Sequence, residues 1–212
     1  MSSRNERVFV VGASGNIGSG VVRGLVKKGI DTTAYVRNEQ KTKDLFNDEL
    51  NTGYLTIIVG TYSSIDIYTK AIQGHTRLFL LIADVTDKPA LMGQIKEEFG
   101  KIAFNVGVRQ IVDLSSGSVN TIGKQGIIGY MHTTAEDKLW MLADENPEQR
   151  SLVVLRPEVF MTNHFMSDVH YVKRSNKLVS CGYPASKLTW IDTKGKQKGR
   201  EFVEGYLHNT TK

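Results

Sequence analysis

Short apolar runs alternate along the chain with stretches whose apolar residues recur at helical spacing. Six runs have the length and composition of strands: Val8–Val11, Thr32–Val36, Leu55–Val59, Leu78–Ile82, Gln110–Leu114 and Leu152–Leu155. Helices are predicted over five segments between them: Ile17–Lys27, Lys41–Phe46, Ser64–Ile72, Ala90–Asn105 and Thr134–Ala143. Several strands are continuously apolar, which is typical of parallel strands covered on both faces. The alternation predicts an α/β fold, a doubly wound parallel sheet with right-handed crossovers.

This regular alternation stops after Pro157. The segment from Val159 to Trp190 contains polar turns, aromatic residues and the turn sequence Gly182-Tyr183-Pro184. It predicts a small elaboration on the substrate side of the sheet. We therefore expect residues 1–157 to form a Rossmann core, and residues 158–212 to form a short substrate-side segment packed on the same domain.

Composition places the chain among ordinary globular proteins. The 212 residues are 40% hydrophobic and 23% charged, and no apolar run approaches the length of a membrane span. The first seven residues have no apolar core, so we expect no secretory signal. The single cysteine, Cys181, excludes an internal disulfide and fits a reducing compartment. We expect a cytoplasmic protein without a membrane partner.

The chain is basic, with a net charge of +5 and a sequence pI of about 9.2. The basic residues are scattered, and the densest group lies near the C-terminus: Lys194, Lys196, Lys198 and Arg200. Such a group is typical of a solvated loop, so we do not expect nucleic acid as a partner. A cofactor that carries several phosphates also favours a positive field.

The stretch from Val8 to Gly18 carries the strongest chemical signal, a G-x-x-G-x-x-G turn between a buried strand and an amphipathic helix. The first glycine permits the turn, the second lets backbone N–H groups approach a pyrophosphate, and the third lets the helix pack close to the sheet. The helix N-terminus adds the positive end of its dipole. We expect the turn to bind a dinucleotide through Gly12, Ser14, Gly15, Asn16, Ile17 and Gly18.

The end of the second strand indicates which dinucleotide is bound. An acidic residue there would accept hydrogen bonds from the ribose hydroxyls of NAD, whereas an arginine pairs with the 2′-phosphate of NADP. This chain has Arg37 followed by Asn38, with Lys41 nearby and no carboxylate at the strand end. The alternative is an arginine that only faces solvent. We expect NADP(H), bound by Arg37 and Asn38.

Other cofactor contacts are expected where the remaining strands end, because ligands of such sheets bind at the carboxyl ends. These positions are Thr61, Ile82, Ala83, Ser115, Pro157 and Val159. No metal is expected.

Three stretches together resemble the NmrA-like family, an atypical branch of the short-chain dehydrogenase/reductase superfamily. They are the glycine turn, Tyr35–Asn38 and Leu155–Asn163, and the resemblance runs from about Arg7 to Thr193. It implies a Rossmann fold and NADP(H) binding. The family includes reductases of quinones and unsaturated heterocycles, as well as cofactor-sensing regulators without catalysis. Its members usually continue further, so the substrate lobe here is expected to be short or completed by a second subunit in a homodimer.

The resemblance also implies a place for catalysis. Superfamily enzymes carry a Y-x-x-x-K pair on the helix after the fifth strand, where one helical turn places both side chains on one face. Here Lys138 lies in that helix, but Thr134 stands four residues before it. A literal Y-x-x-x-K occurs at Tyr183–Lys187, after the sixth strand, where Pro184 disfavours a helix.

We therefore expect Lys138, Tyr130 and Ser116 to be the catalytic residues, with Lys138 also holding the cofactor. The alternative for Lys138 is an ordinary surface lysine. His132 is a further candidate proton donor, or a residue that only satisfies the start of the helix. A quinone or imine could take its proton from water, so hydride transfer would not need a tyrosine.

Two functions remain open from the sequence. The first is an NADP(H)-dependent reductase that transfers hydride to a small organic substrate, such as a quinone, enone or imine. The second is a non-catalytic NADP-sensing regulator that binds a partner protein. The missing tyrosine favours the regulator, and the glycine turn with Arg37 is common to both.

Overall fold

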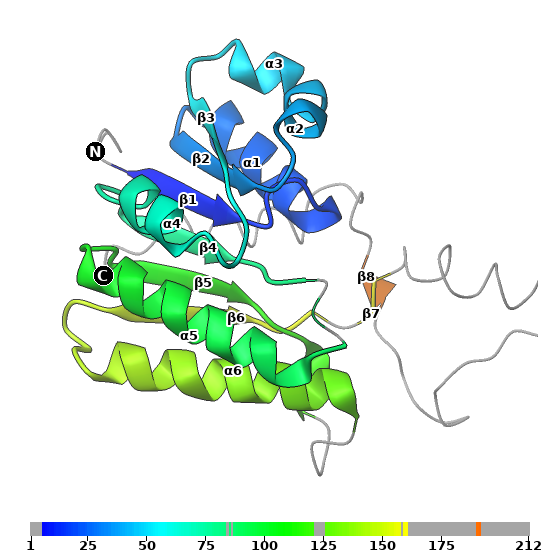
Figure 1. The fold of residues 1–212 in the computed structure, drawn as a ribbon, viewed down its shortest axis with the longest axis vertical. Helices are drawn as coiled ribbons and strands as arrows, with labels where there is room; N and C mark the ends of the chain where they lie inside the picture. Colours follow the sequence, from blue (N-terminus) through cyan, green and yellow to red (C-terminus); the bar gives the residue numbers. More distant parts are fainter. Residues whose placement is uncertain are drawn as a thin grey trace, which may run out of the picture.

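The computed structural model describes residues 6–83, 85, 87–120, 126–157, 159–160 and 190–191. One parallel sheet of six strands has helices on both faces (Figure 1). Its strands are β1 (Arg7–Val11), β2 (Asp31–Val36), β3 (Leu55–Val59), β4 (Arg77–Leu80), β5 (Gln110–Leu114) and β6 (Ser151–Leu155). They lie in the order β3-β2-β1-β4-β5-β6, so the winding reverses between β1 and β4. The predicted doubly wound α/β fold is confirmed.

Six helices and one 3₁₀ turn connect the strands. They are α1 (Asn16–Lys27), α2 (Glu39–Leu45), α3 (Asn47–Leu50), α4 (Ile65–Ala71), α5 (Pro89–Asn105), η1 (Gly117–Asn120) and α6 (Ile127–Asp144). Two short strands, β7 (Val159–Phe160) and β8 (Trp190–Ile191), form a separate parallel pair. Most of residues 158–212 lies outside the described part, so the division of the chain at residue 157 stays a prediction.

Alternating side chains of the central strands fill two separate cores. On β1, Phe9 and Val11 face α4, α5 and α6, whereas Val8 and Val10 face α1 and α3. On β4, Phe79 joins the second group, and Leu78 and Leu80 join the first. Burial on both faces explains why these strands are continuously apolar in the sequence.

Three details of the predicted elements are wrong. The fourth strand ends at Leu80 instead of Ile82, and the helix expected over residues 41–46 begins earlier, as α2, and is followed by α3, which was not predicted. The last helix begins at Ile127, two turns earlier than expected. Its N-cap is Gly126 with φ of 95° and no side-chain cap, so the sequence has no start signal there.

An aromatic cluster fixes the end of β3 beside β2. Tyr68 of α4 stacks on Phe99 of α5 with centroids 3.9 Å apart, and Tyr35 packs edge-on against Tyr68. The Tyr35 hydroxyl donates to the carbonyl of Thr61 at 2.8 Å. Gly60 makes room for this ring, because a Cβ there would lie 2.2 Å from the Tyr35 oxygen. The carboxyl end of β3 is therefore held against β2.

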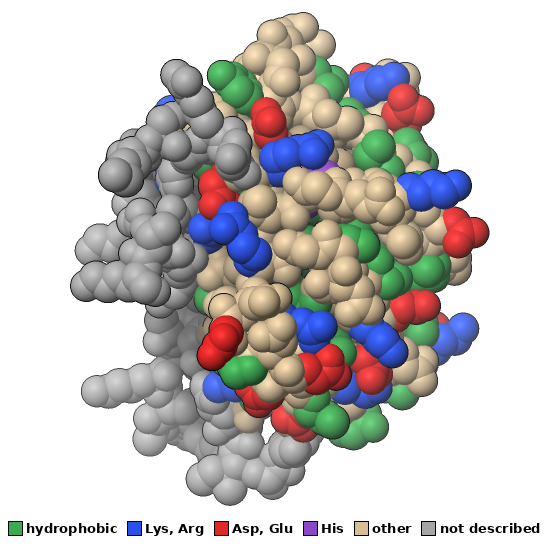
Figure 2. Space-filling model, turned by 90° about the vertical axis from the view of Figure 1, so that its left-hand side faces the viewer, with side chains coloured by type: hydrophobic (Ala, Val, Ile, Leu, Met, Phe, Trp, Pro, Cys, Tyr) green, Lys and Arg blue, Asp and Glu red, His purple; other side chains and the backbone are tan. Residues whose placement is uncertain are grey.

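The face that looks onto the amino ends of the strands is shown in Figure 2. On it, acidic and basic side chains are interspersed and do not gather into a basic patch. Among the helices that the structure describes, none is both long enough and apolar enough to cross a membrane.

His75, just before β4, is buried in this fold as a neutral side chain. Its ring packs edge-on against Phe9, Nε2 lies 2.9 Å from the hydroxyl of Thr33, and Nδ1 lies 3.0 Å from the carbonyl of Ile72. Burial lowers the pKa of His75, because the charged form would lose its hydration.

The fold should therefore lose stability in acid through His75. Below the ordinary histidine pKa of about 6.5, the unfolded chain takes up a proton that the folded protein does not, so the free energy of unfolding falls. In urea denaturation between pH 7.5 and 5.5, His75→Gln should show a shallower loss than the wild type. The other histidines are common to both proteins, and equal slopes would contradict this account.

Candidate functional site

The glycine turn lies between β1 and α1, at the carboxyl edge of the sheet. Gly12 has φ of 76°, and a Cβ there would lie 2.7 Å from the Leu81 carbonyl oxygen. At Gly18 a Cβ would lie 2.1 Å from the Gly12 carbonyl oxygen. The fold itself therefore requires glycine at both positions.

Gly15 differs from these two glycines. It is the N-cap of α1 with φ of −78°, an ordinary extended conformation. A Cβ there would meet only the Gly12 oxygen, at 3.3 Å. The backbone therefore does not demand glycine at this position, and the absent side chain leaves open space in front of the N-terminus of α1.

That space belongs to a cavity of about 280 Å³ above the ends of β1, β2, β3 and β4. It is lined by Val11, Gly12, Ser14, Gly15, Tyr35, Val36, Arg37, Lys41, Gly60, Thr61, Tyr62, Leu81 and Ala83. The structure thus brings together six residues predicted to bind the cofactor: Gly12, Ser14, Gly15, Arg37, Thr61 and Ala83. The other predicted positions lie outside this lining: Asn16, Ile17, Gly18, Asn38, Ile82, Ser115, Lys138 and Pro157. The side chain of Val159 is outside the described part, so its role stays a prediction.

The charge of the cavity is positive. Among the residues that the structure describes, Arg37 and Lys41 are its charged lining residues. Asn38 has a structural role here: its Oδ1 accepts the backbone N–H of Lys41 at 2.9 Å and caps α2. The cap fixes the start of α2 and with it the backbone of Lys41. This half of the cavity suits an anionic group such as a phosphate.

Tyr62 is a lining residue that the sequence analysis missed. Its hydroxyl accepts the backbone N–H of Ala83 at 3.2 Å and lies 3.3 Å from the Ala83 carbonyl. The tyrosine thereby ties the loop after β3 to the loop after β4. No local pattern marks it, because its partner lies 21 positions away.

Hydrogen bonds to side-chain hydroxyls within the loop hold the loop that carries Tyr62. The backbone N–H of Thr61 donates to the Ser64 oxygen at 3.1 Å. Ser64 stands at the N-cap position of α4 but makes no cap hydrogen bond.

A second polar cluster lies further along the same edge, where β5 and β6 end against α5 and α6. Lys96 of α5 and Asp113 of β5 are completely buried, and the ammonium lies 2.6 Å from the carboxylate. Lys96 also donates to the Leu114 carbonyl at 3.1 Å. Burial raises the pKa of Asp113, and the ammonium of Lys96 opposes that rise.

Glu136 of α6 joins this cluster to the end of β6. Its buried carboxylate accepts the hydroxyl of Ser115 and forms an ion pair with Arg156, whose Nε lies 3.1 and 3.2 Å from the two oxygens. The hydrogen bond to Glu136 raises the pKa of Arg156. Pro157 adds one link, because its carbonyl accepts the N–H of Gly117 at 2.8 Å.

The three predicted catalytic residues do not meet at this cluster. Lys138 pairs with Glu97 of α5 in the seam between α5 and α6. Tyr130 is 49% exposed on the outer side of α6, and the Ser116 hydroxyl bonds to Ser118 within the turn. Their catalytic roles stay predictions. The Tyr183–Lys187 sequence lies outside the described residues.

His132 lies one helical turn before Glu136. From the sequence it was a candidate proton donor, or a residue that only satisfies the start of the helix. The pKa of its imidazole is lowered to about 4, first by burial and then by the nearby Lys96 ammonium, while Glu136 opposes the shift. Its Nδ1 is buried and has no hydrogen-bond partner among the described residues.

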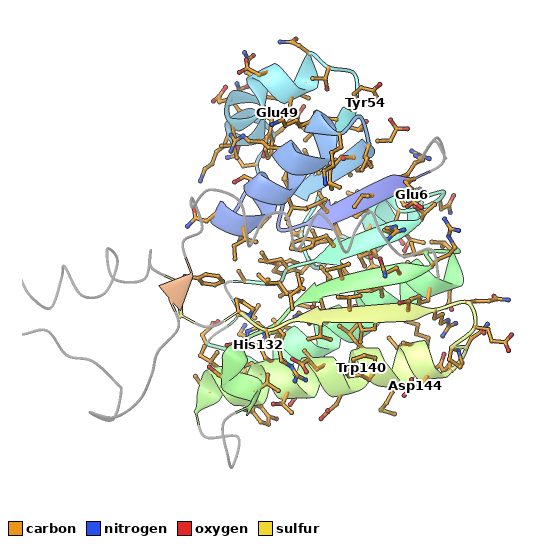
Figure 3. The ribbon with its side chains drawn as sticks, turned by 180° about the vertical axis from the view of Figure 1, so that it is seen from behind. Glu6, Glu49, Tyr54, His132, Trp140 and Asp144 are labelled. Carbon is orange, nitrogen blue, oxygen red and sulfur yellow. The ribbon has the colours of Figure 1, made fainter. Side chains whose placement is uncertain are left out.

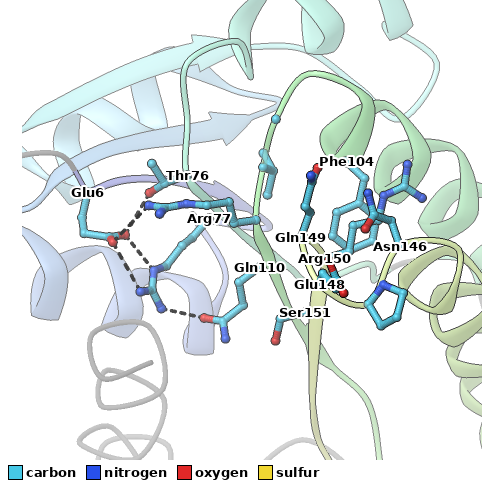
Figure 4. Close-up of a pocket in the computed structure, with 14 residues that line it drawn as sticks. Glu6, Thr76, Arg77, Phe104, Gln110, Asn146, Glu148, Gln149, Arg150 and Ser151 are labelled. Atoms are coloured by element: carbon cyan, nitrogen blue, oxygen red, sulfur yellow. Dashed lines mark hydrogen bonds and ion pairs between the residues drawn. The ribbon is translucent and has the colours of Figure 1, made fainter. Parts of the chain in front are cut away.

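A larger cavity of about 590 Å³ lies at the opposite edge, by the amino ends of β4, β5 and β6 (Figure 4). Several of its charged residues form ion pairs: Glu6 lies 2.7 Å from Arg77 and 3.5 Å from Arg109. Arg77 also donates to Gln110 at 2.6 Å, and Arg150 pairs with Glu145. These pairs tie neighbouring strand starts together, so we assign them a structural role.

The comparisons with known proteins agree with this site at the level of the fold. A family model described as NAD(P)H-binding matches residues 12–149. Pen from Bacillus thuringiensis superposes with a TM-score of 0.77 at 14% identity, covering 97% of this chain and 66% of that one. No curated protein matches the chain.

Two further solved structures bear on the resemblance seen in the sequence. An NADPH-dependent quinone oxidoreductase from Escherichia coli has a TM-score of 0.58 and 21% identity, over 78% of this chain and 52% of that one. A mutant NmrA has a TM-score of 0.60 and 15% identity, over 75% and 47%. The chain thus spans about half the length of these two neighbours and about two thirds of the length of Pen.

Loss of the ammonium in the buried pair should be costly. Lys96→Met leaves the Asp113 carboxylate buried without its partner, and we expect the free energy of unfolding to fall by about 3–5 kcal/mol. In the double variant Lys96→Met/Asp113→Val, neither charge of this pair remains, so most of that loss should be recovered. Urea denaturation at pH 7 measures both, and a double variant as unstable as the single one would contradict the explanation.

Proposed function

The chain belongs to the NAD(P)H-binding family, and from that premise we propose that it is an NADPH-dependent reductase that transfers hydride to a small organic substrate. The observation that carries the proposal is the basic cavity in front of α1, with Gly15 at its floor. Quinones, enones and imines are the substrate classes we favour. The likeness to the NADPH-dependent quinone oxidoreductase supports this choice through the fold.

The residues present fit a dinucleotide. The open space at Gly15 and the N-terminus of α1 suit the pyrophosphate, because unpaired N–H groups and the helix dipole favour anions there. Arg37 and Lys41, on the β2 side of the cavity, suit the 2′-phosphate of NADP. We therefore favour NADP(H) over NAD(H).

The bound nicotinamide would supply the hydride. The chain's own residues would bind and orient it, since the carboxyl edge holds no tyrosine–lysine pair within the described residues. The developing anion of a reduced quinone is stable enough to take its proton from water. Orientation and exclusion of competing reactions would then be the main contributions of the protein.

Turnover decides between the reductase and a cofactor-sensing regulator. Purified protein with NADPH under anaerobic conditions should oxidise the cofactor when given a panel of quinones, enones and imines. Gly15→Val is the matched control: its side chain would occupy the pyrophosphate space, so binding and turnover should both be lost while the far-UV circular dichroism spectrum is kept. NADPH binding without turnover on any panel member would reject the reductase in favour of the regulator.

Arg37 should set the choice of cofactor. Arg37→Ala removes a charge-assisted contact that only NADPH can make, so NADPH binding should weaken by about 1–3 kcal/mol and NADH binding by little. Fluorescence titration with each nucleotide measures the two losses. Equal losses for both nucleotides would place the 2′-phosphate elsewhere.

A further inference from the structure

We propose that His132 holds the nicotinamide-side half of the dinucleotide, with its neutral imidazole hydrogen-bonded to a hydroxyl of that ribose. The inference rests on the proposed function, because it requires a dinucleotide in the cavity. It adds a second anchoring point, separate from the glycine turn and from Arg37.

The strand order determines where the second half of the dinucleotide extends. In the proposed function the phosphates would lie at Gly15, beside β1, and the adenosine half over β2 by Arg37, since both residues line the cavity. A dinucleotide crosses the point where the winding reverses, so its other half extends over β4 toward β5. Neighbouring strands are about 4.8 Å apart, which places the end of β5 about 10 Å from β1.

Two contacts of Glu136, together with helical spacing, place His132 at that end. Ser115 follows β5 directly, and its hydroxyl bonds to Glu136 of α6. Glu136 is also fixed by Arg156 at the end of β6. His132 lies four residues before Glu136, on the same face of α6, because residues four apart are neighbours along a helix. Figure 3 shows His132 toward the carboxyl ends of the strands and Glu6 at the opposite end.

Burial, and then the Lys96 ammonium, lower the pKa of His132 and keep its imidazole neutral. Lys96 comes from α5, Asp113 from β5, Glu136 from α6 itself and Arg156 from the end of β6. Burial and the Lys96 ammonium outweigh Glu136. A neutral imidazole has one donor and one acceptor nitrogen, which matches a sugar hydroxyl.

The ring has a nitrogen to spare for a ligand. Its Nδ1 is enclosed and has no partner among the described residues, yet the side chain is only partly buried, so Nε2 is the nitrogen that an outside group can reach. An enclosed nitrogen without a partner costs stability. A role of the imidazole ring in ligand binding would explain why the fold tolerates this cost.

Lys138, by contrast, is turned away from this position. It lies two residues beyond Glu136, and a helix rotates about 200° over two residues, so it points to the other side of α6. There it pairs with Glu97. Of the polar residues three and four positions before Glu136, Thr133 is buried, whereas His132 is partly exposed and can meet an outside group.

The test compares the whole dinucleotide with its adenosine half. Dissociation constants for NADP⁺ and for 2′,5′-ADP are measured by calorimetry on the wild type, His132→Ala and His132→Gln, with Asp137→Asn, an exposed neighbour on α6, as the control. His132→Ala should weaken NADP⁺ binding about three- to tenfold, as expected for one hydrogen bond, and leave 2′,5′-ADP unchanged. His132→Gln, which keeps a hydrogen-bonding group, should recover part of the loss.

The possible failures can be told apart. Unchanged NADP⁺ affinity in His132→Ala, or equal losses for both ligands in both His132 variants, would overturn the role of His132. A loss in Asp137→Asn as large as in His132→Ala would also overturn it, because the effect would then belong to α6 as a whole. A wild type that binds neither ligand would overturn the proposed function itself.

Discussion

The approach of α1 to the end of β1 is the constraint on which the carboxyl edge depends. A side chain at Gly18 would lie 2.1 Å from the Gly12 carbonyl oxygen, so the helix could not begin where it does. Because α1 begins there, its first N–H groups face the space in front of Gly15. The same contact therefore packs α1 on the sheet and creates an anion-binding end in the cavity.

At the ends of β5 and β6, the same edge of the sheet is held by ion pairs and hydrogen bonds of charged side chains, and not by close backbone packing. Lys96 and Asp113 join α5 to β5 without access to water, and Glu136 joins α6 to the ends of β5 and β6 through Ser115 and Arg156. Buried pairs of this kind add little net stability compared with apolar packing, but they are strongly directional. Their effect is to hold α5 and α6 in one register against the sheet, so the side chains of α6 near the edge have defined positions.

The sequence predicted the parts of the fold that rest on local patterns. The strands, the glycine turn and the position of Arg37 follow from apolar periodicity and from the spacing of residues within one βα unit. The charged cluster could not be predicted this way, because Ser115, Glu136 and Arg156 are about 20 positions apart and meet only in the fold. The start of α6 was also missed, since a glycine with positive φ stands where a capping side chain would be expected.

That missed start had a consequence for the choice of residues on α6. The sequence predicted a helix that begins at Thr134. In that helix Lys138 would lie one turn from the start, at the place where the resemblance puts the lysine of the superfamily. With the helix beginning at Ile127, the first two turns approach the sheet edge, and the face toward Ser115 is set by Glu136. A partly exposed polar residue near this face is His132, which burial and Lys96 keep uncharged. If the nicotinamide half of a dinucleotide is held here, it is held by a neutral hydrogen bond, and the positive charge toward the cofactor is concentrated at Arg37 and Lys41 on the adenosine side.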